Sequence, residues 1–364
     1  MKIGLIGLPK SGKTTLFNLL TGAGAPTARF DAGRSELHTG VARVPDPRVD
    51  RLSGLFRPRK TTYAAFEVVD LAGIEKGEHG GLETKEFRSA DALLHVVRAF
   101  PDPALGAPDP RRDVLDLETE LILADLEVVD RRLERLEASI KKRRTDAEVR
   151  EQEILRRLKS ELEAETPLRA VQLGADDGKA VRGFTFLSQK PILHCLNLAE
   201  EALGEGARDV LARAVVSFDL AGIGDRPRTR LGWVSALIET EVARLDEEAQ
   251  RAFLADLGLE ERTINRVLHD CYALLGLISF FTVGEDEVRA WPIRDGTRAQ
   301  DAADTVHSDI ARGFIRAEVT AYEDLVAVEG AFAEIRARGQ LRLEGKDYLV
   351  RDGEVCHFRF NVAK

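Results

Sequence analysis

The segment that most constrains this chain is Gly7-Leu8-Pro9-Lys10-Ser11-Gly12-Lys13-Thr14, which satisfies the spacing G-x-x-x-x-G-K-[ST]. An apolar run at Met1–Leu8 precedes it and a helical pattern at Lys13–Thr21 follows it, so the segment joins a strand to a helix. Glycines at these positions let main-chain N–H groups close around phosphates, and the helix start adds its positive dipole end. The alternative is a chance glycine-rich turn, which the flanking strand and helix disfavour. The sequence therefore predicts a loop that binds the phosphates of a nucleotide.

Individual residues of this site have separate expected roles. Lys13 is expected to reach the terminal phosphates as the catalytic residue, and Thr14 to offer its hydroxyl to Mg²⁺. Asp70 ends an apolar run and opens Asp70-Leu71-Ala72-Gly73, which predicts a second magnesium ligand at Asp70 and a γ-phosphate contact at Gly73. The same tetrad recurs at Asp219, but order along the chain favours Asp70. The expected phosphate-binding residues are Gly7, Lys10, Ser11, Gly12, Lys13, Thr14, Thr15 and Gly73.

The pattern beyond the loop predicts an α/β fold with a doubly wound, mostly parallel sheet. Apolar runs at 64–69, 92–97 and 191–197 read as further strands, and helical segments separate them. An insert interrupts this order, because residues 116–165 contain almost no Gly or Pro and place Leu and Ile at helical spacing. We expect this insert to form a helical hairpin that stands off the sheet.

The last third of the chain predicts a change of architecture. Helical patterns cover 235–257 and 260–275, and short strands with one helix around 299–313 follow from Gly276 onward. The expected strands of this small, mostly antiparallel α+β domain are 278–283, 288–293, 341–343, 347–350 and 358–362. The predicted domains are 1–112 with 183–275 for the nucleotide, 113–182 for the hairpin and 276–364 for the C-terminal domain.

Composition excludes several classes of protein. The formal net charge of −9 disfavours a chain that coats nucleic acid through bulk electrostatics. Three widely spaced cysteines lack any metal or redox spacing, and G-x-G-x-x-G, the dinucleotide fingerprint, does not occur. No apolar run is long enough to cross a bilayer, and the N-terminus opens directly into a strand pattern. We expect no signal peptide, no membrane contact and a cytoplasmic location.

Separate motifs along nearly the whole chain resemble the YchF/Obg-like ATPases, a branch of the translation-factor-like P-loop NTPases. The resemblance implies a nucleotide domain interrupted by a helical hairpin, followed by a ubiquitin-like β-grasp domain of the TGS type. Besides the phosphate loop with Thr15-Leu16-Phe17-Asn18, it rests on Thr39-Gly40-Val41, Pro45-Asp46-Pro47-Arg48, Asp70-Leu71-Ala72-Gly73 with Lys76-Gly77, His95-Val96-Val97-Arg98, Ala124-Asp125-Leu126, Asn197-Leu198-Ala199-Glu200, Val288-Arg289-Ala290-Trp291, Gly313-Phe314-Ile315-Arg316-Ala317 and Glu344-Gly345-Lys346-Asp347-Tyr348.

The base-reading motif bears on the choice of nucleotide. Guanine-specific relatives carry N-K-x-D, whose aspartate accepts two hydrogens from guanine, whereas this chain has Asn197-Leu198-Ala199-Glu200 after a strand. A site without that aspartate leaves guanine unpaired and shifts preference toward ATP, in agreement with the family. The alternative is that Asn197 is only a turn residue that ends a strand. The expected base-binding residues are Asn197, Leu198, Glu200 and, by the family's pattern, Ser235 and Ala236 on the next strand.

Hydrolysis is expected to be slow. Ras-like enzymes orient the attacking water with a Gln after the D-x-x-G glycine, but this chain has the apolar Ile74 there. The regions 75–86 and 101–112 are shorter than in typical members and offer no obvious substitute, so no general base is assigned. His79 lies nearby, and we interpret it as a solvated loop histidine.

Two departures from the family's pattern concern the ions. Family members usually have an Asn where this chain has Lys10, and in potassium-stimulated relatives that Asn helps to hold K⁺. Either the ammonium of Lys10 occupies the potassium position, or the side chain extends into solvent. The threonine that usually completes magnesium coordination aligns with Arg34, and Ser35 and Thr39 are both candidates for its role.

The expected partners are ATP, or GTP, and the ribosome. The hairpin turn concentrates positive charge at Lys141, Lys142, Arg143 and Arg144, which suits rRNA contact, and the TGS domain resembles modules of ribosome-associated proteins. The alternative for the turn is a solvated face balanced by nearby glutamates. The leading hypothesis is a nucleotide-controlled ATPase switch on ribosomes. An Obg-type GTPase and an interaction module that barely hydrolyses its nucleotide are the rival hypotheses.

Overall fold

The computed structural model describes residues 1–23, 38–70, 88–203 and 209–361. Contacts divide the chain into two units. The first unit comprises Met1–Val41 and Glu67–Leu274, and the second comprises Ala42–Phe66 and Leu275–Lys364. Each unit is described separately below.

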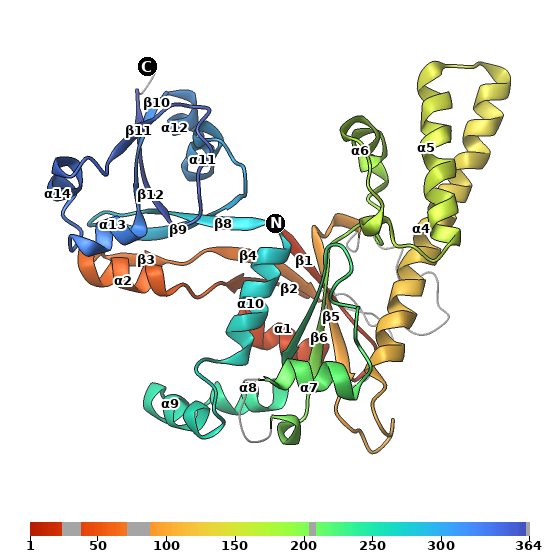
Figure 1. Cartoon of the computed structure of the whole chain (residues 1–364), viewed down its shortest axis with the longest axis horizontal. Coiled ribbons are helices and arrows are strands. Elements are labelled where there is room, and N and C mark those ends of the chain that lie inside the picture. The colour runs from red at the N-terminus through yellow and green to blue at the C-terminus, as the bar shows by residue number, and fades with distance from the viewer. Residues whose placement is uncertain (24–37, 71–87, 204–208, 362–364) are drawn as a thin grey trace. The chain divides into compact units, whose positions relative to one another are not determined.

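The first unit is built on a sheet with the order β2-β4-β1-β5-β6-β7 (Figure 1). Its strands are β1 (Lys2–Ile6), β2 (His38–Arg43), β4 (Ala65–Asp70), β5 (Ala92–Ala99), β6 (Ile192–Leu198) and β7 (Thr229–Val234). From β4 to β7 every neighbouring pair is parallel. Because parallel strands need helical crossovers that cover both faces, β5 and β6 are buried along their whole length. The predicted doubly wound, mostly parallel sheet is confirmed.

Helices complete the first unit. They are α1 (Lys13–Thr21), α4 (Pro110–Lys142), α5 (Asp146–Glu163), α6 (Ala175–Val181), α7 (Val210–Ser217), α8 (Ala236–Val242), α9 (Glu247–Asp256) and α10 (Thr263–Leu274). Helix α1 begins directly after the glycine-rich loop and buries Leu16, Phe17 and Leu20, while its C-cap Gly22 adopts a left-handed conformation. The predicted helix at 13–21 is therefore correct in both bounds.

The insert forms the expected helical hairpin, α4 against α5, seen in yellow in Figure 1. Helix α4 starts earlier than predicted, because Pro110 occupies its first turn and Asp109 caps it by accepting a hydrogen bond from Arg112 N. Thr145 caps α5, and Glu148 N donates to its hydroxyl at 3.3 Å. The shared core is apolar and contains Ile122, Val129, Leu133, Leu136, Ile154, Leu155, Leu158 and Leu162.

The second unit is a mixed sheet with the order β11-β10-β12-β8-β9-β3. Its strands are β3 (Lys60–Thr62), β8 (Leu277–Thr282), β9 (Glu287–Arg294), β10 (Phe314–Ala321), β11 (Arg342–Glu344) and β12 (Glu354–Phe360). At its centre β8 and β12 are parallel neighbours, whereas the β8–β9 and β10–β12 pairs are antiparallel. Its helices are α2 (Pro47–Phe56), α11 (Ala299–Val306), α12 (Ser308–Arg312), α13 (Tyr322–Ala327) and α14 (Phe332–Ala337). Along the chain, α11 follows β9 and precedes β10, and its alanines lie in the core of this unit. Two strands, a helix and then further strands are the expected β-grasp order.

The division by contacts differs from the predicted one at residues 42–66, which were expected in the nucleotide domain. This segment contributes α2 and β3 to the second unit, where β3 pairs with β9 in parallel. Arg48 of α2 also forms an ion pair with Asp352 at 2.7 Å. These contacts are long-range, so local sequence pattern carries no trace of them.

Other predicted elements needed correction. Residues 347–350 form no strand and contribute only an isolated bridge between Leu349 and Arg298. The helical stretch 235–257 is two helices, α8 and α9, because Asp246 caps a new helix by accepting from Ala249 N. The helix around 299–313 is likewise divided into α11 and α12 at His307. Strand β10 was not predicted, although it is the partner of both β11 and β12.

Among the residues that the structure describes, no helix combines the length and apolar character that crossing a bilayer requires.

Candidate functional site

The glycine-rich loop adopts the backbone that its glycines predict. Gly7 has φ +157° and Gly12 has φ +95°. A Cβ on Gly7 would lie 2.5 Å from the carbonyl oxygen of Val96, and a Cβ on Gly12 would lie 2.4 Å from Asn197 Nδ2. Both contacts are too close for any side chain, so the loop requires glycine at these two positions.

Lys13 lies at the centre of the loop's electrostatics. Its Nζ donates to the carbonyl oxygens of Gly7 at 2.8 Å and Leu8 at 3.1 Å. Burial lowers the pKa of Lys13, and the nearby carboxylate of Asp70 partly offsets this. The ammonium is therefore held in a partly desolvated place, where its attraction to an anion is stronger than in water.

The two predicted magnesium ligands lie together. Thr14 Oγ1 donates to Asp70 Oδ2 at 3.2 Å, although 56 residues separate them in the chain. Burial raises the pKa of Asp70, while Lys13, the Thr14 hydrogen bond and His38 lower it. A hydroxyl and a carboxylate that converge beside a buried ammonium are suited to a hard divalent cation. His38, at the start of β2, is a member of this corner that sequence reasoning missed.

The rival carboxylate Asp219 lies elsewhere, in the turn after α7. Its side chain pairs with Arg111 at 3.0 Å, and both are largely exposed. Only Asp70, at the carboxyl end of β4, contacts Thr14. The choice of Asp70 from order along the chain agrees with this placement.

Several expected residues cannot be placed. Gly73, Ile74, His79, Arg34 and Ser35 lie outside the described residues. Thr39, the other candidate for the magnesium site, is exposed on β2.

A cavity of roughly 890 Å³ opens beside the loop and contains most of the predicted base-binding residues. Its lining includes Gly12, Thr15, Asn18, Leu19, Phe100, Pro101, Asn197, Leu198, Ala199, Glu200, Glu201, Ala236, Leu237, Thr240 and Arg244. The volume falls within the range of small-molecule sites. Phe100 and Arg244 were not predicted, because their positions follow β5 and α8 and carry no motif of their own.

Asn197 does more than end a strand. Its Nδ2 donates to Ser11 O at 2.9 Å, and its Oδ1 accepts from Ala236 N at 3.0 Å. One buried amide thus connects the phosphate loop to the loop after β7. Both ends of the amide therefore act as a structural link, a role that the turn alternative did not include.

The sequence analysis expected Ser235 and Ala236 on a strand. In the structure they lie at the start of α8 instead. Ser235 is its N-cap residue and is buried, and its hydroxyl has no hydrogen-bond partner among the described residues. Ser11 of the phosphate loop has the same property. Two buried hydroxyls without partners are unusual in a folded protein and mark places where a ligand can supply the missing bond.

Lys10 is exposed and has φ +63°, a left-handed conformation that is uncommon for lysine. Its charge contributes to lowering the pKa of Asp102, after the backbone hydrogen bonds from Ala104 and Leu105. Among the described residues it makes no hydrogen bond, so both interpretations of its ammonium stay open.

The hairpin turn exposes all four predicted cations, at residues 141–144. Four glutamates were expected to balance them: Glu134, Glu137, Glu148 and Glu151. Glu137 pairs with Arg156 at 3.3 Å and Glu151 with Arg132 at 2.7 Å, whereas Glu134 is exposed. Glu148 accepts hydrogen bonds from Ser139 at 2.7 Å and Thr145 at 2.8 Å, which lower its pKa, and the charge of Arg143 adds to this effect. The tip therefore presents concentrated positive charge to solvent.

Comparisons with known proteins agree with this architecture. A family model described as a 50S ribosome-binding GTPase matches residues 2–130, and the model YchF-GTPase_C, described as a protein of unknown function, matches residues 277–361. The chain is 41% identical to the ribosome-binding ATPase YchF of Bacillus subtilis (strain 168), over 99% of both chains. It is 37% identical to the protein of the same name from Escherichia coli O157:H7, again over 99% of both. The solved YchF GTPase of Schizosaccharomyces pombe matches with a TM-score of 0.83 at 28% identity, covering 99% of this chain and 97% of that one.

Proposed function

The chain belongs to the YchF family, and from this we propose that it is a nucleotide-dependent switch that binds and slowly hydrolyses ATP with Mg²⁺ and associates with ribosomes in the cytoplasm. The observation that carries the proposal is the cavity next to the phosphate loop, which joins the loop to the segment 197–200. The cavity meets the predicted phosphate-binding residues at Gly12 and Thr15, so a base bound at 197–200 would lie next to the phosphate site.

ATP is the preferred nucleotide of this proposal. In guanine-specific relatives an aspartate accepts the hydrogens on guanine N1 and N2, whereas this lining has Glu200 at that position, with its carboxylate one methylene farther from the main chain. The hydroxyl of Ser235 is buried without a partner among the described residues, directly before Ala236 of the lining, and could serve an adenine. A site that leaves a buried polar group of guanine unpaired disfavours GTP by a large factor.

The catalytic corner fits Mg²⁺. Thr14 and Asp70 would hold the ion, and Lys13 would bind the terminal phosphates. Bound Mg²⁺ neutralises charge on the phosphates. Lys13 and the main-chain N–H groups of the loop orient the phosphate chain, which is the larger part of phosphoryl-transfer catalysis. Ile74 cannot orient a water, so the proposal is of slow intrinsic hydrolysis.

Ribosome association is proposed through the hairpin tip and through the second unit, which we infer to be a TGS-type β-grasp domain. The support is the four exposed cations at residues 141–144 and the printed names of the bacterial relatives. Positive charge on a projecting hairpin suits the phosphates of rRNA.

A competitive titration tests the nucleotide. Purified protein is titrated with labelled ATP and competed with ATP or GTP, with and without ribosomes. We expect ATP to compete at least tenfold better than GTP. Equal competition, or better competition by GTP, would favour an Obg-type GTPase, the rival that the printed name of the Schizosaccharomyces pombe relative supports.

Single-turnover phosphate release separates an enzyme from an interaction module. Protein in excess over ATP, with Mg²⁺ and K⁺, is expected to release phosphate slowly but completely. Release no faster than in a Lys13→Ala control would mean that the bound nucleotide is structural.

A further inference from the structure

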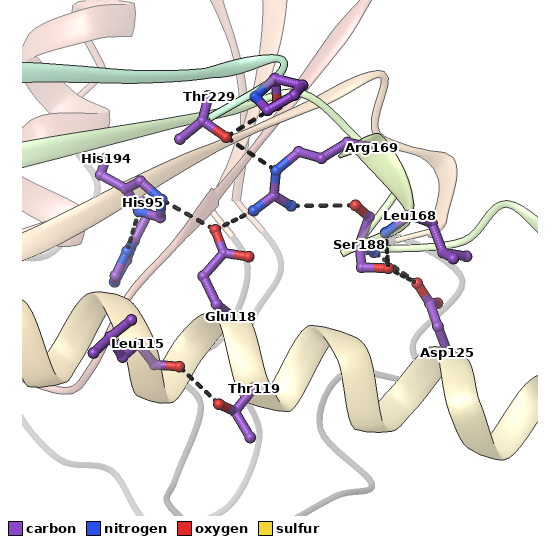
Figure 2. Close-up of polar contacts among 11 residues, drawn as sticks. His95, Leu115, Glu118, Thr119, Asp125, Leu168, Arg169, Ser188, His194 and Thr229 are labelled. Atoms are coloured by element: carbon purple, nitrogen blue, oxygen red, sulfur yellow. Dashed lines mark hydrogen bonds and ion pairs between the residues drawn. The ribbon is translucent and has the colours of Figure 1, made fainter. Parts of the chain in front are cut away.

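A chain of four buried polar side chains runs through the first unit, from β5 through β6 to α4 and the short helix Leu168–Ala170 (Figure 2). His95 Nδ1 lies 2.9 Å from His194 Nδ1, in directly paired positions of β5 and β6. His194 Nε2 lies 3.2 Å from Glu118 Oε1, which also accepts a hydrogen bond from Arg169. All four side chains are almost completely buried.

Such a group is not needed for stability alone. Taking a carboxylate, a guanidinium and two imidazoles out of water costs free energy, and apolar residues of similar volume often serve a core as well or better. A buried polar chain does, however, fix the orientation of each ring and the position of each proton. In this protein, the fixed ring orientations and proton positions determine which nitrogen of His95 can accept a hydrogen bond.

The protons of this chain can be assigned from its anchored end. Burial opposes the charge of Glu118, but hydrogen bonding to His194 and the charge of Arg169 lower the pKa of Glu118 to about 2, so the carboxylate is ionised and only accepts. His194 must then donate through Nε2. Burial lowers the pKa of His194 despite Glu118, so the ring is neutral and its Nδ1 is an acceptor. The proton between the two rings therefore belongs to His95 Nδ1.

This assignment leaves His95 with an unprotonated Nε2. Burial, with His194 and Lys13 adding to it, lowers the pKa of His95 well below its ordinary value, so the ring is neutral. Within the described parts of the chain, Nε2 makes no hydrogen bond. The ring lines a cavity of roughly 260 Å³ together with Gly7 and Leu8 of the phosphate loop.

The cavity adjoins the catalytic lysine through those same two residues. The carbonyl oxygens of Gly7 and Leu8 accept hydrogen bonds from Lys13 Nζ. A space of this size holds several water molecules, since each needs about 30 Å³ in the liquid. The wall also carries the carboxyl groups of Asp113, Asp116 and Glu120 from α4, so a water in this space meets several acceptors. His95 Nε2 is the one among them whose ring is held in place by the buried polar chain.

We propose that His95 is a positioning residue for nucleotide hydrolysis: held as the Nδ1–H tautomer by His194, Glu118 and Arg169, it presents Nε2 as a fixed hydrogen-bond acceptor to water beside Gly7 and Leu8. The kinetic part of this inference rests on the proposed function, and the tautomer part does not. The sequence motifs do not predict this role of His95, because the four residues of the polar chain come from four separate segments.

Nuclear magnetic resonance of the wild-type protein with ¹⁵N-labelled histidine tests the tautomers directly. We expect His95 to show a protonated Nδ1 and a bare Nε2, and His194 the reverse. Signals are assigned by their loss in the His95→Asn and His194→Gln variants, or by their contacts if a variant does not fold. A protonated Nε2 on His95, or a rapid exchange between tautomers, overturns the inference.

Two variants at one position separate positioning from packing. In His95→Asn the amide nitrogen replaces Nδ1 and still donates to His194, but the acceptor at the Nε2 place is lost. In His95→Gln the amide oxygen reaches the Nε2 place and restores an acceptor. We expect kcat for ATP to fall about tenfold in His95→Asn, which corresponds to about 1.4 kcal/mol, with KM unchanged, and to recover largely in His95→Gln.

The outcomes are distinguishable. Equal rates in both variants and wild type, or equal losses in both, would contradict positioning by Nε2. A protein that binds neither ATP nor GTP would instead refute the proposed function, and the resonance experiment would still decide the tautomer. Thermal melting of each variant excludes a loss of fold as the cause.

Discussion

At the scale of single residues, Gly12 joins the two halves of the nucleotide site. Its left-handed backbone turns the loop into α1, and Nδ2 of Asn197, the residue that bridges to α8, lies 2.4 Å from the place of a Cβ on Gly12. A side chain here must displace Asn197, and the bridge is lost with it.

Gly12→Ala is therefore expected to weaken ATP binding at least a hundredfold in an equilibrium titration. Gly222→Ala is the matched control, because Gly222 also has a positive φ, +78°, nothing lies within 4 Å of its Cβ position, and it does not line the cavity. Both variants carry the backbone strain of about 1 kcal/mol, and only the first meets Asn197. Similar affinities for the two variants would contradict the steric role of Gly12.

The carboxylate of Asp70 is expected to lower the free energy of unfolding while it supports Mg²⁺ binding. Because burial raises the pKa of Asp70 above its ordinary value of 3.8, its ionised form disfavours folding at neutral pH. Asp70→Asn should thus raise the unfolding free energy of the nucleotide-free protein at pH 7, and the gain should shrink as pH falls toward 3.8, where the carboxyl protonates in both states.

The same substitution should weaken Mg²⁺-dependent ATP binding about tenfold or more, since one of two protein oxygens near the metal loses its charge. Chemical denaturation across pH measures the first effect and titration with Mg²⁺ the second. Asp219→Asn is the control, because that carboxylate is exposed and paired with Arg111. A stability loss in Asp70→Asn at pH 7 would contradict the assigned sign.

Lys10 tests the ion hypothesis. If its ammonium replaces K⁺, then Lys10→Asn should make hydrolysis depend on added K⁺, while wild type stays indifferent. Asparagine also tolerates the left-handed backbone at this position better than lysine does, so the variant should fold at least as well. Steady-state rates in KCl and in NaCl decide the matter, and equal rates for Lys10→Asn end the hypothesis.

At the scale of elements, the hairpin of α4 and α5 separates two kinds of charge. Cations along its length are paired, such as Arg156 with Glu137 and Lys159 with Asp130, whereas those at the tip, 141–144, are exposed. Exposed pairs contribute little to stability, so charge can be removed from either region without unfolding the helices.

Neutralising all four tip residues should reduce co-sedimentation with ribosomes and flatten its dependence on salt, because fewer phosphate contacts release counterions. The matched control removes the same number of cations from α5, at Arg150, Arg156, Arg157 and Lys159, each of which has a partner on the protein. If the tip variant sediments like wild type, or if both variants lose binding equally, the tip is not the contact.

At the scale of the whole molecule, residues 42–66 belong to the second unit, although the chain on either side of them belongs to the first unit. Helix α2 buries Val49 and Leu52 entirely, and it contacts β9, β3 and α13. The second unit is therefore built from two stretches of chain that are more than 200 residues apart.

Leu52→Ala should destabilise the second unit by about 2–5 kcal/mol, the usual cost of truncating a fully buried leucine. The two tryptophans report on different units, Trp233 on β7 and Trp291 on β9. In variants that keep only one of them, the unfolding midpoint seen by Trp291 should fall, and that seen by Trp233 should move less. A larger fall in the midpoint seen by Trp233 than in that seen by Trp291 would indicate that residues 42–66 stabilise the nucleotide domain instead.

Local pattern was sufficient for the parts of this protein whose cause is local. The spacing of Gly7, Gly12 and Lys13 predicted the loop, because a turn that binds phosphate needs those residues in that order. Period and capping predicted α1 and the hairpin, and the apolar runs predicted the parallel sheet. The bounds of α8 and α9 were wrong because one cap, Asp246, outweighed a continuous helical pattern.

Only the tertiary structure decided what depends on residues far apart in the chain meeting in space. It placed Asp70 beside Thr14, committed both ends of the Asn197 amide, and assigned residues 42–66 to the second unit. It also brought His95, His194, Glu118 and Arg169 into one proton-ordering chain. These contacts form because the complete fold has the lowest free energy. That free energy depends on all residues together, so no short segment of the sequence predicts the contacts.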